Sequence, residues 1–170
     1  TVVLGPRYRG LIKDIFRKKI ITDDFSMYVH RPSASDPSVA PEGGDAFYAL
    51  VPVPNLDSGT DWATETPKFR DRIVKRLQET LLPGLSQHIV TEHIVAPPYF
   101  RDRLSSERGA AFGMEPQLLQ SAWFRPHNKS EELGRLFFVG AGTHPGAGLP
   151  GVVTSAKVVD SLVPAAHTLV

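Results

Sequence analysis

The sequence predicts a mixed fold of the α/β (or α+β) class, built from short strands and amphipathic helices. Three observations lead to this prediction. The 14 Gly and 15 Pro divide the 170 residues into short segments bounded by turns. Some segments are rich in β-branched and aromatic residues, whereas others repeat their apolar residues at spacings of three and four. Near the C-terminus, a short apolar run leads into a Gly-rich turn and then into another helical repeat.

The N-terminal part is expected to form a strand, a helix and a second strand. The apolar residues 1–4 predict a short buried strand that Gly5-Pro6 ends. Residues 25–29 alternate and predict the second strand. The helix is predicted over residues 7–19, where one face carries Tyr8, Leu11, Ile12, Ile15 and Phe16. The other face is basic, with Arg7, Arg9, Lys13, Arg17 and Lys18, and Lys19 follows it.

The central part contains the clearest helix signal. Residues 31–45 are polar and Pro-rich, and the apolar residues 47–53 predict a strand. Thr66 can cap a helix whose first turn contains Pro67. The apolar stripe of this helix is Phe69, Ile73, Leu77 and Leu81. Residues 88–95 favour a strand through their β-branched residues, and residues 97–104 a short helix.

Composition excludes several classes of site. The absence of Cys excludes disulfides, thiolate metal ligands and a Cys nucleophile, and it is compatible with a reducing, cytoplasmic location. The net charge of +1 gives no general argument for nucleic-acid binding, and no metal site is expected. Because the chain starts inside an apolar run without Met, we expect a C-terminal piece of something longer.

The C-terminal part offers a binding turn. Arg135–Val139 predicts a buried strand, and the repeat of Val152, Ala156, Val159 and Val163 predicts a helix. Between them lie five Gly in residues 140–151. Gly permits positive φ and close approach, and the N–H groups that open a helix attract an anion or a polarised carbonyl. The GAGLPG at 146–151 is a poor dinucleotide fingerprint because the strand ends too early and Pro150 interrupts it. A connection that only packs helix on strand remains the alternative.

Two motifs together resemble bacterial-type phytoene desaturases, which are FAD-dependent carotenoid desaturases. They are QSAWFRPHN at 120–128 and LFFVGAGTHPGAGLPGV at 136–152. The resemblance extends upstream through DFS at 24–26, HRP at 30–32 and LLPG at 81–84, so it covers almost the whole chain. It implies that residues 1–130 are part of a substrate domain with a mixed or antiparallel sheet and helices. Residues 131–170 would then be the closing strand, turn and helix of a Rossmann-like FAD domain.

The resemblance also implies a cofactor, a substrate and a set of site residues. The turn would lie beside the pyrophosphate, ribityl chain and pyrimidine edge of FAD. The expected cofactor-binding residues are Gly140, Ala141, Gly142, Thr143, His144, Gly146, Pro150, Gly151, Val152 and Val153. The expected residues along the phytoene tunnel are Trp123, Phe124 and Arg125, with a core aromatic pair and a surface Arg as the alternative. No catalytic acid or base is assigned.

Three questions stay open at this point. His144 has either a functional role, as a flavin contact or a catalytic acid or base, or only a structural role at the surface or in packing. The basic face of residues 7–19 predicts peripheral contact with an anionic membrane, or it is merely solvated. The function that the resemblance implies is desaturation of phytoene towards lycopene. The alternatives are a diapocarotenoid desaturase, a ketolase and a non-catalytic remnant that binds a lipid or a partner.

Overall fold

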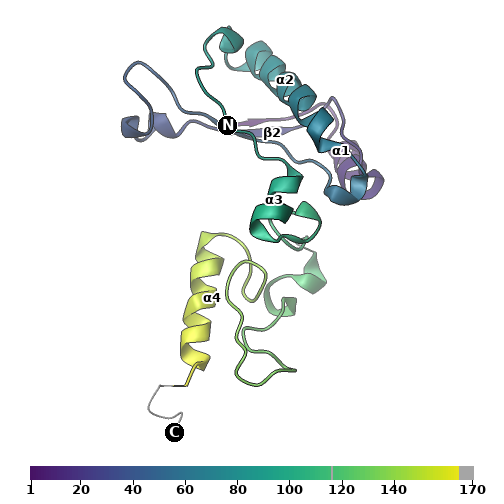
Figure 1. Cartoon of the computed structure of the whole chain (residues 1–170), viewed down its shortest axis with the longest axis vertical. Coiled ribbons are helices and arrows are strands. Elements are labelled where there is room, and N and C mark those ends of the chain that lie inside the picture. Colours follow the sequence, from purple (N-terminus) through teal and green to yellow (C-terminus); the bar gives the residue numbers. More distant parts are fainter. Residues whose placement is uncertain (116, 165–170) are drawn as a thin grey trace. The chain divides into compact units, whose positions relative to one another are not determined.

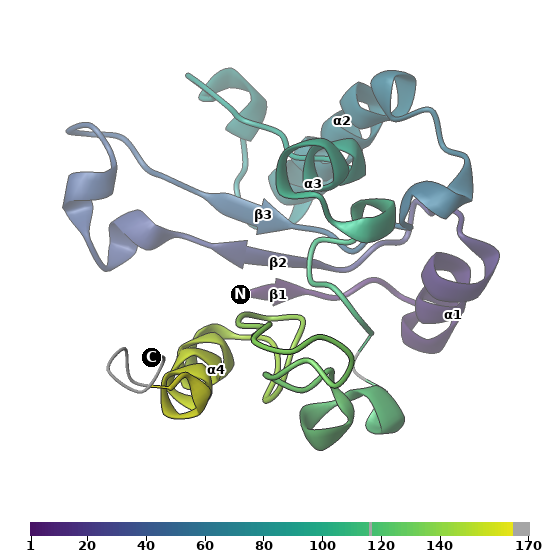
Figure 2. The same cartoon turned by 60° about the horizontal axis from the view of Figure 1, so that its bottom comes forward.

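The computed structural model describes residues 1–115 and 117–164, and it divides the chain into two compact units, Thr1–Arg103 and Leu104–Val170. The first unit contains a three-stranded sheet in the order β1-β2-β3, formed by Val2–Val3, Met27–His30 and Tyr48–Leu50 (Figure 1 and Figure 2). Both pairs are antiparallel, with Val2 opposite Tyr28 and Val29 opposite Ala49. The expected mixed fold with an antiparallel sheet and helices is therefore confirmed.

The core of the first unit lies between this sheet and α2, the helix Trp62–Thr80 (Figure 1). Met27 and Val29 of β2 are buried against the helix, whereas Tyr28 and His30 point away and are exposed. The ring of Phe69 meets that of Phe25 edge-on, with centroids 5.0 Å apart. Each large apolar side chain buried here contributes roughly 1.5–3 kcal/mol, so this contact determines which face of β2 points inward.

The first helix differs from its predicted form. α1 spans Tyr8–Lys13 and continues as a π-helical turn over Asp14–Lys18, which Lys19 ends in the left-handed conformation (φ 56°). Leu11 and Ile15 are buried as expected, but Ile12 is 41% and Phe16 54% exposed. The buried side is shared with Asp14, whose carboxylate pairs with Arg7 and Lys18. These ion pairs allow an acid to be buried where the apolar stripe was expected to continue.

The expected start of α2 at Thr66 is wrong. The helix begins at Trp62, because the Asp61 side chain accepts hydrogen bonds from the N–H groups of Ala63 and Thr64 and caps it. Pro67 lies inside the second turn, where its missing N–H costs one intrahelical bond. Leu81 follows the helix as its C-cap and is 40% exposed, so the buried stripe ends at Leu77.

The strand expected over residues 88–95 is also wrong. After a 3₁₀ turn over Leu85–Gln87, residues 88–96 have no regular structure, and Val90 is 97% exposed. A β-branched sequence becomes a strand only beside a backbone partner, and none of the described residues pairs with this segment. The next element is as predicted, because α3 spans Pro97–Leu104.

The second unit has one long helix and many turns. α4 spans Leu149–Leu162, as expected from the apolar repeat, although it begins three residues before Val152. The run 135–139 is not a buried strand: Phe137 forms an isolated bridge with Lys129, and Val139 is 59% exposed.

The remaining short elements of both units are 3₁₀ turns. In the first unit they lie at Pro32–Ala34, Pro37–Val39 and Leu56–Ser58. In the second unit they lie at Glu107–Gly109, Leu118–Gln120 and Ala122–Phe124.

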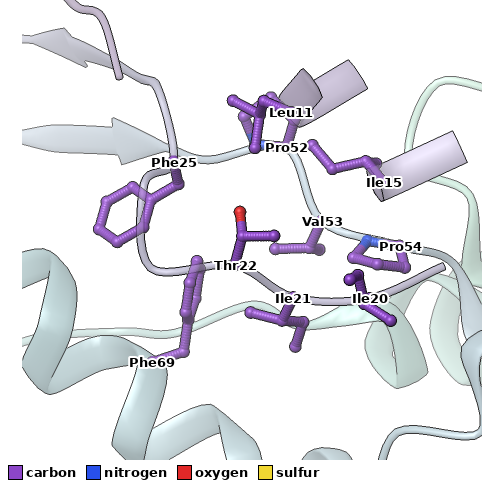
Figure 3. A pocket seen from close by; sticks show the side chains of 10 residues that line it. All are labelled: Leu11, Ile15, Ile20, Ile21, Thr22, Phe25, Pro52, Val53, Pro54 and Phe69. Carbon is purple, nitrogen blue, oxygen red and sulfur yellow. The ribbon is translucent and has the colours of Figure 1, made fainter. Parts of the chain in front are cut away.

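A small apolar hollow lies in the first unit beside α1 (Figure 3). Its lining side chains are apolar apart from Thr22, and they come from α1 and its π-helical turn, from residues 20–25 and 52–54, and from Phe69 of α2. Ligand sites combine an apolar lining with several convergent polar groups. We therefore assign this hollow to imperfect packing under α1. None of the described helices is both long and apolar enough to span a bilayer.

Candidate functional site

The Gly-rich turn has the backbone conformations that its composition predicts. Gly140, Gly146 and Gly148 have φ of 121°, 132° and 92°, which L-residues with a side chain rarely adopt. Gly151 has a different role, since a Cβ placed there would lie 2.5 Å from the carbonyl oxygen of Gly146. A Cβ on Gly142 would meet no heavy atom within 4 Å. The turn is thus closed on the side of Gly151 and open on the side of Gly142.

This turn delivers an uncapped helix N-terminus (Figure 2). Gly148 is the N-cap residue, and its carbonyl accepts from the Val152 N–H at 2.9 Å. Among the described residues, no group accepts a hydrogen bond from the N–H of Leu149 or Gly151. Such an end carries roughly half a positive charge, so it favours an anion or a polarised carbonyl.

The segment 120–128 is hydrogen-bonded to the turn along much of its length. The Pro126 carbonyl accepts from the Thr143 hydroxyl at 2.6 Å and from the His144 N–H at 3.0 Å. The guanidinium of Arg125 is buried, and its Nη1 donates to the Ala141 carbonyl at 2.9 Å. The two motifs that carry the family resemblance therefore form one structural element, a turn and its support.

A buried hydroxyl joins this support to α4. Ser155 is fully buried, and its Oγ accepts from the Gly140 N–H and from Asn128 Nδ2 at 3.0 and 3.1 Å. The same Asn128 amide donates to the Phe138 carbonyl at 3.1 Å. The sequence alone assigned no chemistry to Asn128, the last residue of the first motif, or to Ser155, which follows the second motif. For Ser155 the signal was a hydroxyl on a mostly apolar helix, whereas Asn128 lies in a polar segment and had no comparable signal.

The predicted aromatic residues lie on the outside of this unit. Trp123 and Phe124 are 68% and 56% exposed. The Trp123 ring contacts those of His127 and His144, with centroids 5.4 and 5.9 Å away. His144 Nδ1 lies 3.0 Å from the Ala122 carbonyl oxygen, which can only accept, so the Nδ1–H of His144 donates this hydrogen bond.

The predicted cofactor residues thus lie on the Gly-rich turn and on the first residues of α4, while the predicted substrate residues divide. Trp123 and Phe124 are exposed, whereas Arg125 points beneath the turn. His88 lies outside this site and contacts the Gly84 carbonyl through Nδ1. In the part of the chain that the structure describes, no three His, Cys, Asp or Glu side chains are arranged to hold a metal ion.

A chain with a Gly-rich turn, an uncapped helix N-terminus and a buried polar support has the features of a cofactor-binding element. Comparison with known families identifies the class: residues 22–159 match the model of the flavin containing amine oxidoreductases. The chain belongs to this family, and a flavin is therefore its implied cofactor.

Within the family, the chain is similar to bacterial phytoene desaturases, which confirms the resemblance of its motifs. It is 52% identical over 96% of its length to a neurosporene-forming phytoene desaturase of Rhodobacter capsulatus. It is 53% identical over 95% of its length to a lycopene-forming one of Pseudescherichia vulneris. A 4,4'-diapophytoene desaturase of Methylomonas sp is 40% identical over 98% of the chain. The chain spans about a third of the length of these relatives (32%, 33% and 33%).

Proposed function

We propose that the full-length protein carrying this chain is an FAD-dependent desaturase that converts phytoene stepwise towards lycopene. The observation that carries the proposal is identity above 50% to two phytoene desaturases over nearly the whole chain. The lower identity of 40% to a 4,4'-diapophytoene desaturase favours phytoene over the shorter diapocarotenoid substrate. A ketolase or a non-catalytic lipid-binding remnant has no comparable support.

The turn fits a flavin in its chemistry. Gly140 and Gly148 have positive φ and carry no side chain, and among the described residues no atom would lie within 4 Å of a Cβ on Gly142. The expected contacts are Gly140, Ala141, Gly142, Thr143, His144, Gly146, Pro150, Gly151, Val152 and Val153. FAD supplies the redox chemistry when bound, by taking up a hydride from the substrate. The N–H groups of Leu149 and Gly151 would stabilise negative charge on it without titrating themselves.

The second unit has a surface that suits packing against further protein. Among its described residues, those that are buried are Gly or polar: Gly109, Arg125, Asn128, Thr143, Gly146 and Ser155. In contrast, Leu149, Val153 and Leu162 of α4 are exposed, as is Val139 before the turn. A helix that is apolar on several faces is stable when it is covered. This supports the proposal that residues 131–170 close a Rossmann-like FAD domain, with residues 1–130 in the substrate domain.

The substrate side of the proposal rests on exposed aromatic faces. Phytoene is a long hydrocarbon without polar groups, so its recognition depends on apolar and aromatic contact rather than on hydrogen bonds. Trp123 and Phe124 offer such faces next to the turn, and the edge of His144 lies against Trp123. We therefore propose these two aromatic residues as part of the tunnel wall.

Peripheral membrane contact is proposed for the surface of α1 and its π-helical turn. The side chains of Arg7, Lys18 and Lys19 are committed to carboxylates of this unit. No described carboxylate pairs with Arg9, Lys13 or Arg17, and the neighbouring Ile12 and Phe16 are exposed. Unpaired cations beside exposed apolar side chains match the headgroup region of an anionic bilayer, where an insoluble substrate dissolves.

The function is tested by purifying the full-length protein and supplying phytoene in liposomes. The expected results are the absorption spectrum of bound flavin and accumulation of more desaturated, red-shifted carotenoids. Diapophytoene in parallel liposomes is the control substrate, and it should be converted more slowly. A colourless protein that changes neither substrate would favour the non-catalytic alternative, and faster conversion of diapophytoene would favour the diapocarotenoid alternative.

A further inference from the structure

Arg125 is a buried cation without a counter-charge. The residue is 5% exposed, yet no described carboxylate forms an ion pair with it. Its one hydrogen bond within the described part of the chain runs from Nη1 to the Ala141 carbonyl at 2.9 Å. A guanidinium has five N–H donors, and removing its charge from water is costly unless an anion compensates it. The other guanidinium nitrogens, Nε and Nη2, are not among the side-chain atoms that the described structure buries without a partner. They therefore keep access to the surface beside the turn, where a ligand can reach them.

The place of Arg125 in the fold indicates the missing partner. The Ala141 carbonyl anchors the side chain under the Gly-rich turn, and a Cβ on Gly146 would lie 3.0 Å from its Nε. The absence of a side chain at Gly146 thus leaves room for the guanidinium between turn and support. A hydrocarbon substrate has no group that a guanidinium could bind, whereas FAD has a diphosphate and a pyrimidine ring that becomes anionic on reduction.

We infer that Arg125 binds an anionic oxygen of the flavin cofactor and is not a substrate residue. This inference rests on the proposed function. Two sources supply the same chemistry, the permanently charged diphosphate and the pyrimidine edge of the reduced flavin. Arg suits both because its planar fork forms paired, charge-assisted hydrogen bonds with oxyanions. The Ala141 carbonyl positions the fork, so the turn and its support act together in binding.

The test compares Arg125→Gln, Arg125→Lys and a control, Arg135→Gln, in the full-length protein. Arg135 is an exposed basic residue of the same unit, without a partner among the described residues, so its change removes the same charge from the surface. Two quantities are measured for each variant: the dissociation constant of FAD and the two-electron midpoint potential of the bound flavin. The thermal midpoint of the cofactor-free protein is also measured with and without inorganic pyrophosphate.

If the partner is the diphosphate, Arg125→Gln should bind FAD about 10- to 100-fold more weakly at an unchanged midpoint potential. Pyrophosphate should then stabilise the cofactor-free parent and the control, but not Arg125→Gln. If the partner is the pyrimidine edge, reduced flavin should be disfavoured about 10-fold, which lowers the midpoint potential by about 30 mV. In both cases Arg125→Lys should recover part of the loss, because it keeps the charge.

The inference is overturned if Arg125→Gln loses thermal stability but keeps the affinity, the potential and the pyrophosphate response of the parent. Arg125 would then pair with a carboxylate or serve packing alone. Should Arg125→Gln fail to fold, an Arg125→Lys variant with parental affinity, potential and pyrophosphate response would overturn it equally. A parent protein that binds no flavin refutes the proposed function itself, and this outcome is visible before any variant is made.

Discussion

Gly142 and Gly151 allow the cofactor contact of the turn to be separated from its folding. Neither residue has positive φ, but their surroundings differ. A Cβ on Gly151 would lie 2.5 Å from the oxygen and 3.1 Å from the carbon of the Gly146 carbonyl. Both groups belong to the backbone, so neither can rotate away. A Cβ on Gly142 would meet no atom of the described residues within 4 Å.

These distances predict opposite behaviour for the two Val variants. Gly151→Val should lower the free energy of unfolding by about 1–3 kcal/mol, the usual cost of overpacking. Gly142→Val should change it by less than about 0.5 kcal/mol, as expected for a surface substitution. If the cofactor occupies the space beside Gly142, the same overpacking cost of about 1–3 kcal/mol falls on binding. FAD should then bind roughly 5- to 150-fold more weakly.

The assay is a pair of measurements on the full-length protein, with Gly134→Val as the matched control. Gly134 also has open surroundings and no positive φ, but it lies before the turn. Urea unfolding of the cofactor-free protein gives the folding cost, and titration with FAD gives the binding cost. Parental FAD affinity in Gly142→Val would refute the reasoning, because the open side of the turn would not face the cofactor. Parental stability in Gly151→Val would refute the close packing of Gly146 and Gly151.

Three further predictions concern the membrane, acid stability and the chain by itself. Replacing Arg9, Lys13 and Arg17 with Gln removes three cations worth about 1 kcal/mol each, so binding to anionic vesicles at low salt should weaken about 100-fold in a flotation assay. Replacing Lys68, Lys75 and Arg103 with Gln is the control and should leave this binding unchanged. Equal flotation of both triple variants would show that the first patch is merely solvated. The hydrogen bond from Arg7 lowers the pKa of Asp24 to about 2, so the stability it contributes is complete above the unfolded pKa of ~3.9 and is lost as the pH falls towards 2. Asp24→Asn should therefore flatten the acid limb of a urea-unfolding profile, and an unchanged slope would contradict the pairing. The 170-residue chain alone should bind FAD more weakly than ~1 µM, because one turn contacts only part of so large a cofactor, and a submicromolar constant in a fluorescence titration would disprove this.

Local periodicity predicted the elements whose cause is local. The alternation of β2 appears in the structure as buried Met27 and Val29 between exposed neighbours. Residues 97–104 form α3 with the predicted bounds, and the apolar repeat after the turn forms α4. The glycines of the turn were also readable, because positive φ and close approach are properties of the residue itself. Gly140, Gly146 and Gly148 show the first property, and Gly151 shows the second.

Predictions failed where the outcome depends on a partner outside the segment or on a choice between neighbouring residues. Residues 88–95 have the composition of a strand, but no described strand lies beside them to pair with. The helix α2 begins at Trp62 because Asp61 competes successfully with Thr66 as its cap, and the sequence offers both. In α1, Asp14 is buried on the predicted apolar side because Arg7 and Lys18 neutralise it.

The candidate site shows the same division. The sequence by itself determined the turn, its glycines and the helix that follows, because these depend on neighbours along the chain. Only the tertiary structure decided what supports the turn: the Pro126 carbonyl, the Asn128 amide and the Ser155 hydroxyl. It also decided that Arg125, which was expected along the tunnel, is buried and hydrogen-bonded to the Ala141 carbonyl. The physical reason is that hydrogen-bond satisfaction and burial of charge depend on contacts between segments, which no spacing within one segment reveals.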